Sequence, residues 1–251
     1  MDRFGAYVSI LESQGIAVSA STKILDFGCG DGGLVKSAIS RGLDAYGCDI
    51  DFSQVWLDQE LLAGLVQEGR VRKIEAAGRD NPHYSPLSAD AYRLPFDDAT
   101  FDIVVSDQVL EHVFNYSEVA HELYRVLKPG GVFLHMFPSS FSIIEPHINV
   151  PFAGAFDSNW WLRLWAVLGV RNIYQKDFSV KETVSWNREF LDKGTNYLSK
   201  RQLREDFINL FEVRFLESEF LKTSKRARVF LLPSVYSCLR SRVMYGVRRN
   251  K

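Results

Sequence analysis

The feature that most constrains this chain is a glycine-rich run between a short apolar segment and an amphipathic one. Residues 23–27 (KILDF) have the length and character of a buried strand, and 34–40 (LVKSAIS) carry apolar residues at helical spacing. Between them the sequence reads Gly28-Cys29-Gly30-Asp31-Gly32-Gly33. Glycines let the backbone turn sharply and approach a ligand closely, because no Cβ obstructs it. The run therefore predicts a strand, a tight ligand-binding loop and a helix.

Beyond this loop, short apolar runs alternate with longer amphipathic segments, a pattern typical of repeated βα units and a mostly parallel sheet. We expect further strands at 44–48, near 84–88, and at 101–106, 131–137, 210–217 and 227–232. We expect helices at 52–67, 116–127 and 197–209. The predicted fold is a doubly wound, Rossmann-like α/β architecture with a mostly parallel seven-stranded sheet.

The length of 251 residues favours a single domain, 1–251, with one insertion. After Pro138 the alternation stops for about sixty residues, too many for a bare loop, so 138–197 is predicted to be a substrate cap. This insertion is rich in aromatic residues, namely Phe152, Phe156, Trp160, Trp161, Trp165, Phe178, Trp186 and Phe190. Helical spacing around Trp161 and Trp165 indicates a helix buried against the main domain. The alternative is an apolar acceptor pocket or a surface that enters a membrane interface.

Composition excludes several classes of protein. A formal net charge of −1 disfavours nucleic acid as a partner, since such proteins carry a strongly basic domain or face. Three cysteines without zinc-ligand spacing disfavour a disulfide scaffold or a structural metal site and suit a reducing cytoplasm. The first residues lack the apolar run of a secretory signal, and the apolar stretches 160–170 and 229–239 are shorter than the ~20 residues of a spanning helix. We therefore expect a cytoplasmic protein.

The segment 222–251 is basic. It holds nine positive charges and no Asp or Glu: Lys222, Lys225, Arg226, Arg228, Arg240, Arg242, Arg248, Arg249 and Lys251. Cations near a membrane contribute about 1 kcal/mol each to binding an anionic surface. The segment therefore predicts peripheral contact with an anionic membrane or a phosphorylated carrier, and the alternative is a solvated tail.

The ligand of the glycine-rich loop is narrowed by the residue types around it. Gly28, Gly30 and Gly33 satisfy the G-x-G-x-x-G pattern of dinucleotide-binding proteins, which alone is a weak discriminator. Asp26, two residues before the first glycine, suits a cationic amino-acid ligand, whereas an anionic pyrophosphate prefers bare amides at a helix N-terminus. The carboxylate therefore favours an amino-acid-bearing cofactor over a nicotinamide.

Five motifs in order resemble the class I S-adenosylmethionine-dependent methyltransferases, in the branch that acts on small molecules. They read ILDFGCGDG, YGCD, SADAYRLPF, VVSDQVLEHV and LYRVLKPGGVFLH. The resemblance covers about 23–137 well and the segment after 197 loosely. It implies S-adenosyl-L-methionine as the cofactor, S-adenosyl-L-homocysteine as the product, and no metal.

The resemblance also implies the residues that would bind the cofactor. The loop residues are Asp26, Gly28, Cys29 and Gly30. Asp49, followed by Ile50, matches the acid that bonds the ribose hydroxyls in this family, with Asp51 as a competitor for that role. Asp90 and Ala91 match the adenine-contacting pair, and Ser106 and Asp107 lie near the methionine end.

Methyl transfer from a sulfonium is an in-line displacement that requires alignment and neither a metal nor a covalent nucleophile. A hydroxyl acceptor would gain from a general base, for which histidine is suited. His112, after the fourth strand, is the first candidate, although the Glu111-His112 pair could simply cap and pack a helix. His147, in the run IEPHINVPF, is the second, although it could be a structural residue. We expect His83, His121 and His135 to be surface or packing residues.

The sequence thus predicts an S-adenosylmethionine-dependent methyltransferase that acts on the oxygen of a small-molecule, sugar or lipid-linked acceptor. Methylation of nucleic-acid bases is disfavoured because no Asn- or Asp-Pro-Pro-aromatic motif follows the fourth strand. Two alternatives stay open, a nicotinamide-dependent oxidoreductase that uses the same glycines and a non-catalytic S-adenosylmethionine-binding partner subunit.

Overall fold

The computed structural model describes residues 2–54, 57–74, 93–223 and 241–250. The strands are β1 Lys23–Phe27, β2 Asp44–Asp49, β3 Val71–Lys73, β4 Phe101–Asp107, β5 Leu127–Phe137, β6 Phe211–Phe215 and β7 Arg242–Arg248. The helices are α1 Arg3–Ser13, α2 Gly33–Ile39, α3 Gln59–Gln67, α4 Tyr116–Val126, α5 Asn159–Val167, α6 Val180–Gly194, α7 Lys200–Phe207 and α8 Glu217–Thr223, with a short 3-10 helix, η2 Leu110–His112.

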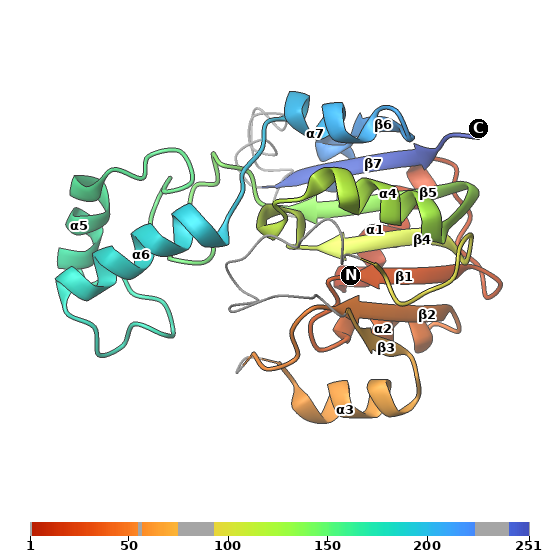
Figure 1. The fold of residues 1–251 in the computed structure, drawn as a ribbon, viewed down its shortest axis with the longest axis horizontal. Coiled ribbons are helices and arrows are strands. Elements are labelled where there is room, and N and C mark those ends of the chain that lie inside the picture. The colour runs from red at the N-terminus through yellow and green to blue at the C-terminus, as the bar shows by residue number, and fades with distance from the viewer. Residues whose placement is uncertain (1, 55–56, 75–92, 224–240, 251) are drawn as a thin grey trace.

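The described strands form one seven-stranded sheet in the order β3-β2-β1-β4-β5-β7-β6 (Figure 1). The first five are parallel, whereas β7 runs antiparallel to both of its neighbours, β5 and β6. The mostly parallel doubly wound fold expected from the sequence is confirmed. Because β1 lies between β2 and β4, the chain changes direction across the sheet there, and ligands of open α/β sheets bind beyond the carboxyl ends of such strands.

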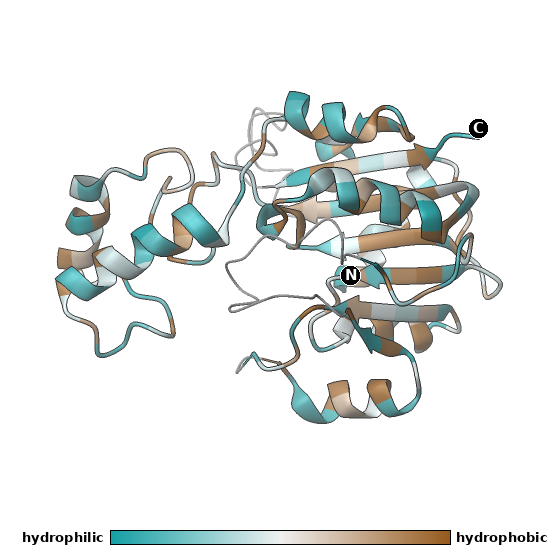
Figure 2. Ribbon diagram, in the orientation of Figure 1, coloured by the Kyte–Doolittle hydropathy of each residue, from teal (hydrophilic) through white to brown (hydrophobic). Residues whose placement is uncertain are grey.

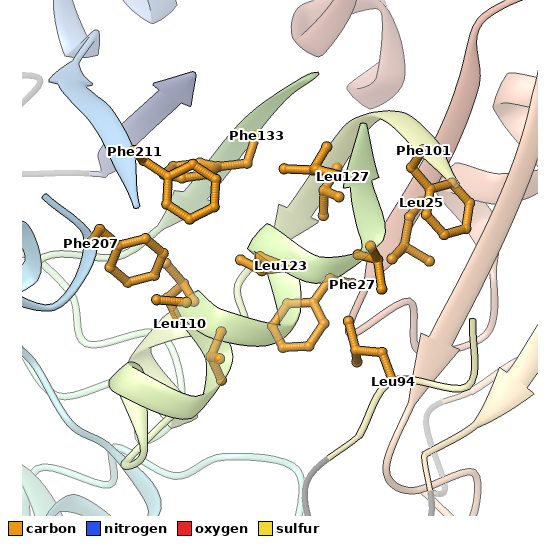
Figure 3. Close-up of a cluster of buried hydrophobic side chains, with 14 of the residues drawn as sticks. Leu25, Phe27, Leu94, Phe101, Leu110, Leu123, Leu127, Phe133, Phe207 and Phe211 are labelled. Carbon is orange, nitrogen blue, oxygen red and sulfur yellow. The ribbon is translucent and has the colours of Figure 1, made fainter. Parts of the chain in front are cut away.

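Helices cover both faces of the sheet because side chains alternate along each strand. On β1, Ile24 packs into the cluster under α1, α2 and α8, whereas Leu25 and Phe27 point to the opposite face, under α4 and α7. Figure 3 shows this second cluster, in which the ring centroid of Phe133 lies 4.9 Å from that of Phe211. Figure 2 shows the consequence for composition, since β1 and β4 are largely hydrophobic while the helices outside them alternate in hydropathy.

The early elements differ from the sequence prediction at two places. The helix expected over 52–67 begins only at Gln59, because the Asp58 side chain accepts a hydrogen bond from the Leu61 amide (3.0 Å) and caps it. The third strand along the described chain is β3, which the sequence did not predict. The strand expected near 84–88 lies outside the described residues. Gly69, at φ 69°, ends α3 and turns the chain directly into the sheet beside β2.

The C-terminal prediction also needs correction. The last described strand is β7, so part of the segment expected to be a basic tail forms the inner strand between β5 and β6. The strand expected at 227–232 lies outside the described residues. The charged ends of this strand are used within the fold. The Arg248 guanidinium lies 4.1 Å from the centroid of the Tyr124 ring, and the Arg242 side chain is 13% exposed beside Glu217. Arg249 donates hydrogen bonds to backbone carbonyls. These contacts tie the three arginines to the fold, and the membrane contact of the basic segment stays a prediction.

The segment between β5 and α7 forms a separate lobe beyond the carboxyl ends of the parallel strands (Figure 1). Helix α5 packs against α6 around a small apolar cluster of its own, made by Ile148, Val150, Ala153, Leu162 and Leu191. The prediction that the tryptophan-bearing helix is buried against the main domain is therefore wrong. Its outer face stays open, with Trp160 68% exposed and Leu168 63% exposed. The role of 138–197 as a substrate cap stays a prediction.

Packing between β5 and β7 gives a first test. A Cβ on Gly246 would lie 2.3 Å from the Phe133 ring, so Gly246→Ala should lower the free energy of unfolding by about 1–3 kcal/mol, measured by chemical denaturation. The matched control is Gly64→Ala in α3, where nothing lies within 4 Å and alanine should stabilise the helix by about 0.5–1 kcal/mol. Equal midpoints for Gly246→Ala and the wild type would contradict this packing.

Candidate cofactor and acceptor site

The glycine-rich loop joins β1 to α2, as the sequence predicts. Gly28 and Gly32 adopt φ values of 75° and 81°, a region that side chains with a Cβ rarely enter. A Cβ on Gly28 would also lie 2.3 Å from the side chain of Val109, which follows β4. The loop therefore lies tightly against the segment after β4, at the carboxyl edge of the sheet.

Asp49 ties the end of β2 to this loop. One carboxylate oxygen accepts from the Gly30 amide (2.8 Å), and the other accepts from the amides of Ile50 (2.6 Å) and Asp51 (3.3 Å). Burial raises the pKa of Asp49, while these amides act in the opposite sense. Asp51 instead accepts hydrogen bonds from Ser53 within its own turn (2.8 Å and 2.7 Å). The geometry favours Asp49 over Asp51 for the role of cofactor acid.

At the end of β4, Ser106 is turned into the core. Its Oγ lies 2.6 Å from Nδ1 of His135, which is fully buried, and its carbonyl accepts from the hydroxyl of Tyr7 (2.6 Å). Burial lowers the pKa of His135 to about 3. The Ser106 side chain therefore serves packing, and His135 is a core residue rather than a surface one.

Asp107, the next residue, lies at the carboxyl edge and forms an ion pair with Arg3 of α1. Burial raises its pKa to about 6 although the Arg3 guanidinium acts to lower it. This partner could not be predicted, because α1 lies far from β4 along the chain and carries no motif.

The Asp107 pKa predicts a dependence of stability on pH. The folded protein holds this proton more tightly than the unfolded chain, where Asp has a pKa of about 3.9, so stability falls as pH rises from about 4 to about 6. Relative to Asp107→Asn, which has no such group, the wild type should lose about 2–3 kcal/mol between pH 4 and pH 7. Urea denaturation of both proteins at several pH values measures this difference, and parallel profiles would contradict it.

The structure brings His112 and His147 together, with ring centroids 4.7 Å apart and the rings nearly perpendicular. His112 ends η2, and its Nδ1 lies 2.6 Å from the carbonyl oxygen of Gly194 at the end of α6. A carbonyl can only accept, so Nδ1 carries the proton, and Nε2 of the neutral ring is the acceptor nitrogen. Phe190 flanks His147 at 5.2 Å between centroids.

His147 is oriented by Glu145. Its Nδ1 lies 2.6 Å from Glu145 Oε1, and the same carboxylate accepts from the Tyr197 hydroxyl (2.6 Å) and from the amides of His147 and Ile148 (2.8 Å each). Burial acts to raise the pKa of Glu145, but these hydrogen bonds prevail and lower it. An ionised, fully bonded Glu145 fixes the proton of His147 on Nδ1. The sequence singled out the Glu-Pro-His run, but it gave no role to Tyr197.

Glu111 completes the cluster. Its side chain is 0% exposed, and in the described part of the chain neither carboxylate oxygen receives a hydrogen bond. Oε1 lies 3.9 Å from Nε2 of His112, and burial raises the pKa of this carboxyl well above its usual range. The alternative in which Glu111 and His112 cap a helix is wrong, because the residue that precedes α4 is Asn115.

Known proteins match the part of the chain that carries the glycine-rich loop, Asp49 and the end of β4. A family model for the methyltransferase domain matches residues 25–135. Demethylmenaquinone methyltransferase of Shouchella clausii is 32% identical over 161 residues, which span 58% of this chain and 63% of that protein. Sterol 4-C-methyltransferase of Caenorhabditis elegans is 29% identical over 119 residues, 47% of this chain and 32% of that protein. Residues 25–135 therefore match a methyltransferase domain.

Solved structures extend the likeness of this methyltransferase domain to the whole fold. An S-adenosylmethionine-dependent methyltransferase from Mesorhizobium loti superposes with a TM-score of 0.54 at 16% identity, over 97% of this chain and 98% of that one. At that identity the likeness concerns the fold alone. The chain spans between about a third and just under two thirds of the two curated relatives.

The residues present in the methyltransferase domain fit its cofactor. Asp26 is buried, and its Oδ1 has no hydrogen-bond partner among the described residues. Burial, together with the charges of Asp107 and Asp49, raises its pKa well above the usual range. A cationic amino group would stabilise the ionised form of this carboxyl. S-adenosylmethionine carries such a group, so Asp26 suits its amino-acid end and Asp49 its ribose.

The other predicted cofactor residues stand as follows. Cys29 and Cys48 are buried free thiols, and burial raises the pKa of both, so neither is an activated nucleophile. Cys29 and Ile50 could therefore contact a cofactor through their backbone atoms but have no reactive side chain for it. Asp90 and Ala91 lie outside the described residues. Within the described part of the chain, no helix is both long and apolar enough to cross a membrane.

Proposed function

We propose that this methyltransferase moves the methyl group of S-adenosylmethionine onto the oxygen of a hydroxylated small molecule, sugar or lipid-linked acceptor. The observation that carries the proposal is the pair of His112 and His147. Both rings have Nδ1 held by an acceptor, so both neutral rings have Nε2 as their basic atom. An acceptor hydroxyl needs such an atom more than a carbon or amine acceptor does.

When bound, the cofactor supplies a methyl group on a positively charged sulfur that departs as a neutral thioether. The chain contributes position and proton removal. The loop of Gly28 and Gly30, held by Asp49, would fix the cofactor at the end of β1. His147 would take up the hydroxyl proton at Nε2, and the ionised Glu145 on Nδ1 would stabilise the resulting imidazolium.

Apolar side chains beside the histidines support a lipophilic acceptor. Phe141, Ile143 and Ile144, in the segment that leads from β5 to His147, are 54%, 44% and 55% exposed. A lipid tail would cover these side chains. The names of the two relatives, which mention a sterol and demethylmenaquinone, point to the same class.

Peripheral contact with an anionic membrane belongs to the same proposal. The outer face of α5, with Trp160 and Leu168, has the exposed apolar character of a surface that enters the membrane interface. Of the basic set, Arg242, Arg248 and Arg249 make contacts within the fold, so such contact would depend mainly on the aromatic and apolar residues of the lobe. The net charge of −1 gives no support for nucleic acid as a partner.

The test is transfer of labelled methyl from S-adenosylmethionine by the purified chain to hydroxylated glycan and lipid extracts, with mass spectrometry of the product. Label in a methyl ether is expected, and the absence of transfer to any hydroxylated extract would contradict the proposal. Tryptophan fluorescence titrated with both cofactors separates the alternatives. A response to nicotinamide alone would indicate an oxidoreductase, and S-adenosylmethionine binding without turnover would indicate a non-catalytic partner subunit.

A further inference from the structure

We propose that Glu111, His112 and His147 bind a divalent transition-metal ion. One ligand atom of each residue lies within 4.8 Å of the others, so small side-chain movements would bring all three onto one ion. Two imidazoles and one carboxylate suit zinc and other first-row divalent ions, and fit poorly with magnesium, which prefers oxygen ligands. The ligands come from two parts of the fold, since η2 follows β4 whereas His147 belongs to the inserted lobe.

The hydrogen bonds behind the histidines are those of a metal site. Histidines that bind metals usually donate the other ring N–H to a carboxylate or a backbone carbonyl, which fixes the tautomer and orients the ring. His112 does so to the carbonyl of Gly194 and His147 to Glu145, each at 2.6 Å. Glu145 is held in turn by the Tyr197 hydroxyl. Both Nε2 atoms are therefore prepared to donate a lone pair.

Glu111 supplies the independent observation. A carboxyl group that is wholly buried and forms no hydrogen bond among the described residues stays ionised at low cost only where a cation compensates its charge. Its Oε1 lies 3.9 Å from Nε2 of His112. A cation between these atoms would compensate the Glu111 charge and use the lone pair of His112 at the same time.

An ion bound by three protein ligands keeps at least one position open. A hydroxyl or water placed there would have a lowered pKa. Activation of the acceptor by the ion rests on the proposed function, whereas binding of the ion does not. In the metal-bound protein the two histidines would bind the ion, and the ion would activate the acceptor. The expectation from the sequence that methyl transfer requires no metal would then be wrong.

The experiment uses the full chain after treatment with a chelator, without cofactor or acceptor. Zn²⁺ is titrated by calorimetry, and Co²⁺ is titrated by visible absorption. We expect one ion per chain and much weaker binding of Mg²⁺. Glu111→Gln and His147→Gln should each weaken Zn²⁺ binding by more than about 100-fold, and Glu145→Gln, which alters the support of a ligand, by about 10–100-fold.

The matched control is His121→Gln, on the exposed side of α4, where binding should be unchanged. Thermal melting and S-adenosylmethionine binding establish that each variant is folded, and His147→Gln, with a half-buried side chain, serves if Glu111→Gln unfolds. No ion binding, equal binding by all variants, or a Co²⁺ spectrum with thiolate bands would overturn the site. Failure of methyl transfer with intact ion binding would contradict only the proposed function.

Discussion

Asp49→Ala is expected to weaken S-adenosylmethionine binding by about 100-fold or more. The Asp49 carboxylate accepts from three backbone amides, and Gly30 in the cofactor loop is one of the donors. Hydrogen bonds to a charged group contribute about 1.5–3 kcal/mol each, and a loss of 2.7 kcal/mol corresponds to a factor of about 100. Alanine removes the ribose partner and also the support of the loop. Calorimetric titration with S-adenosylmethionine and S-adenosylhomocysteine measures the change.

The control for this variant lies on the same strand. Asp44 begins β2 at the opposite edge of the sheet, where it forms an ion pair with Arg70 (2.5 Å) and is 40% exposed. Asp44→Ala should leave cofactor affinity unchanged, because an exposed ion pair contributes little and lies far from the loop. Equal loss in both variants would indicate damage to β2 as a whole. Unchanged affinity in Asp49→Ala would show that the acid is not a cofactor ligand.

The glycine-rich loop and its contact with Asp49 could be predicted because their determinants are local. A buried strand, a loop that requires glycine and a helix follow each other within 23–40, and Asp49 ends the next strand. The fold then places these segments side by side, since β1 pairs with β2 in parallel. A parallel pair brings both carboxyl ends to one edge, so the sequence order already contains the proximity of Gly30 and Asp49.

Elements with weak or misleading local patterns could not be predicted. β3 is three residues long, VRK, and only its first residue is buried, so it shows no strand periodicity. β7 has arginine at both ends and lies in a segment without acids, so the segment was interpreted as a basic tail rather than as a strand. In the fold, burial of Val243 to Tyr245 between two neighbouring strands outweighs that charge, and Arg248 finds a partner in the Tyr124 ring.

The acceptor half depends on contacts that no local pattern contains. Each histidine could be nominated from its place after a strand. Their meeting, however, requires the inserted lobe to dock through Gly194 on His112, and it requires Tyr197 to hold Glu145 within the lobe. These pairs are separated by 82 and 52 positions in the chain. The orientation of the lobe, rather than the residue types, brings His112 and His147 together and leaves Glu111 buried beneath them.

His147→Ala is expected to lower kcat for methyl transfer to a hydroxyl acceptor by about 10²–10⁴-fold, the range that a positioned base or acid contributes. The reason is that His147, fixed by Glu145, presents its basic nitrogen next to His112. Single-turnover rates with labelled cofactor and an acceptor found in the extract screen measure the effect. Cofactor affinity should be unchanged, because the predicted cofactor residues Asp26 and Asp49 lie on β1 and β2, whereas His147 belongs to the inserted lobe.

Glu145→Gln tests whether His147 needs the carboxylate of Glu145 to act, because this variant keeps the imidazole and removes its charged partner. Glutamine keeps the size of the side chain, but it cannot stabilise a positive charge on His147, so kcat should fall less than in His147→Ala while KM changes little. His121→Ala, on the exposed side of α4, should have wild-type kinetics. Wild-type rates in His147→Ala and in His112→Ala would show that alignment alone drives the transfer. A fall in kcat shared by His121→Ala would point to an effect unrelated to the pair.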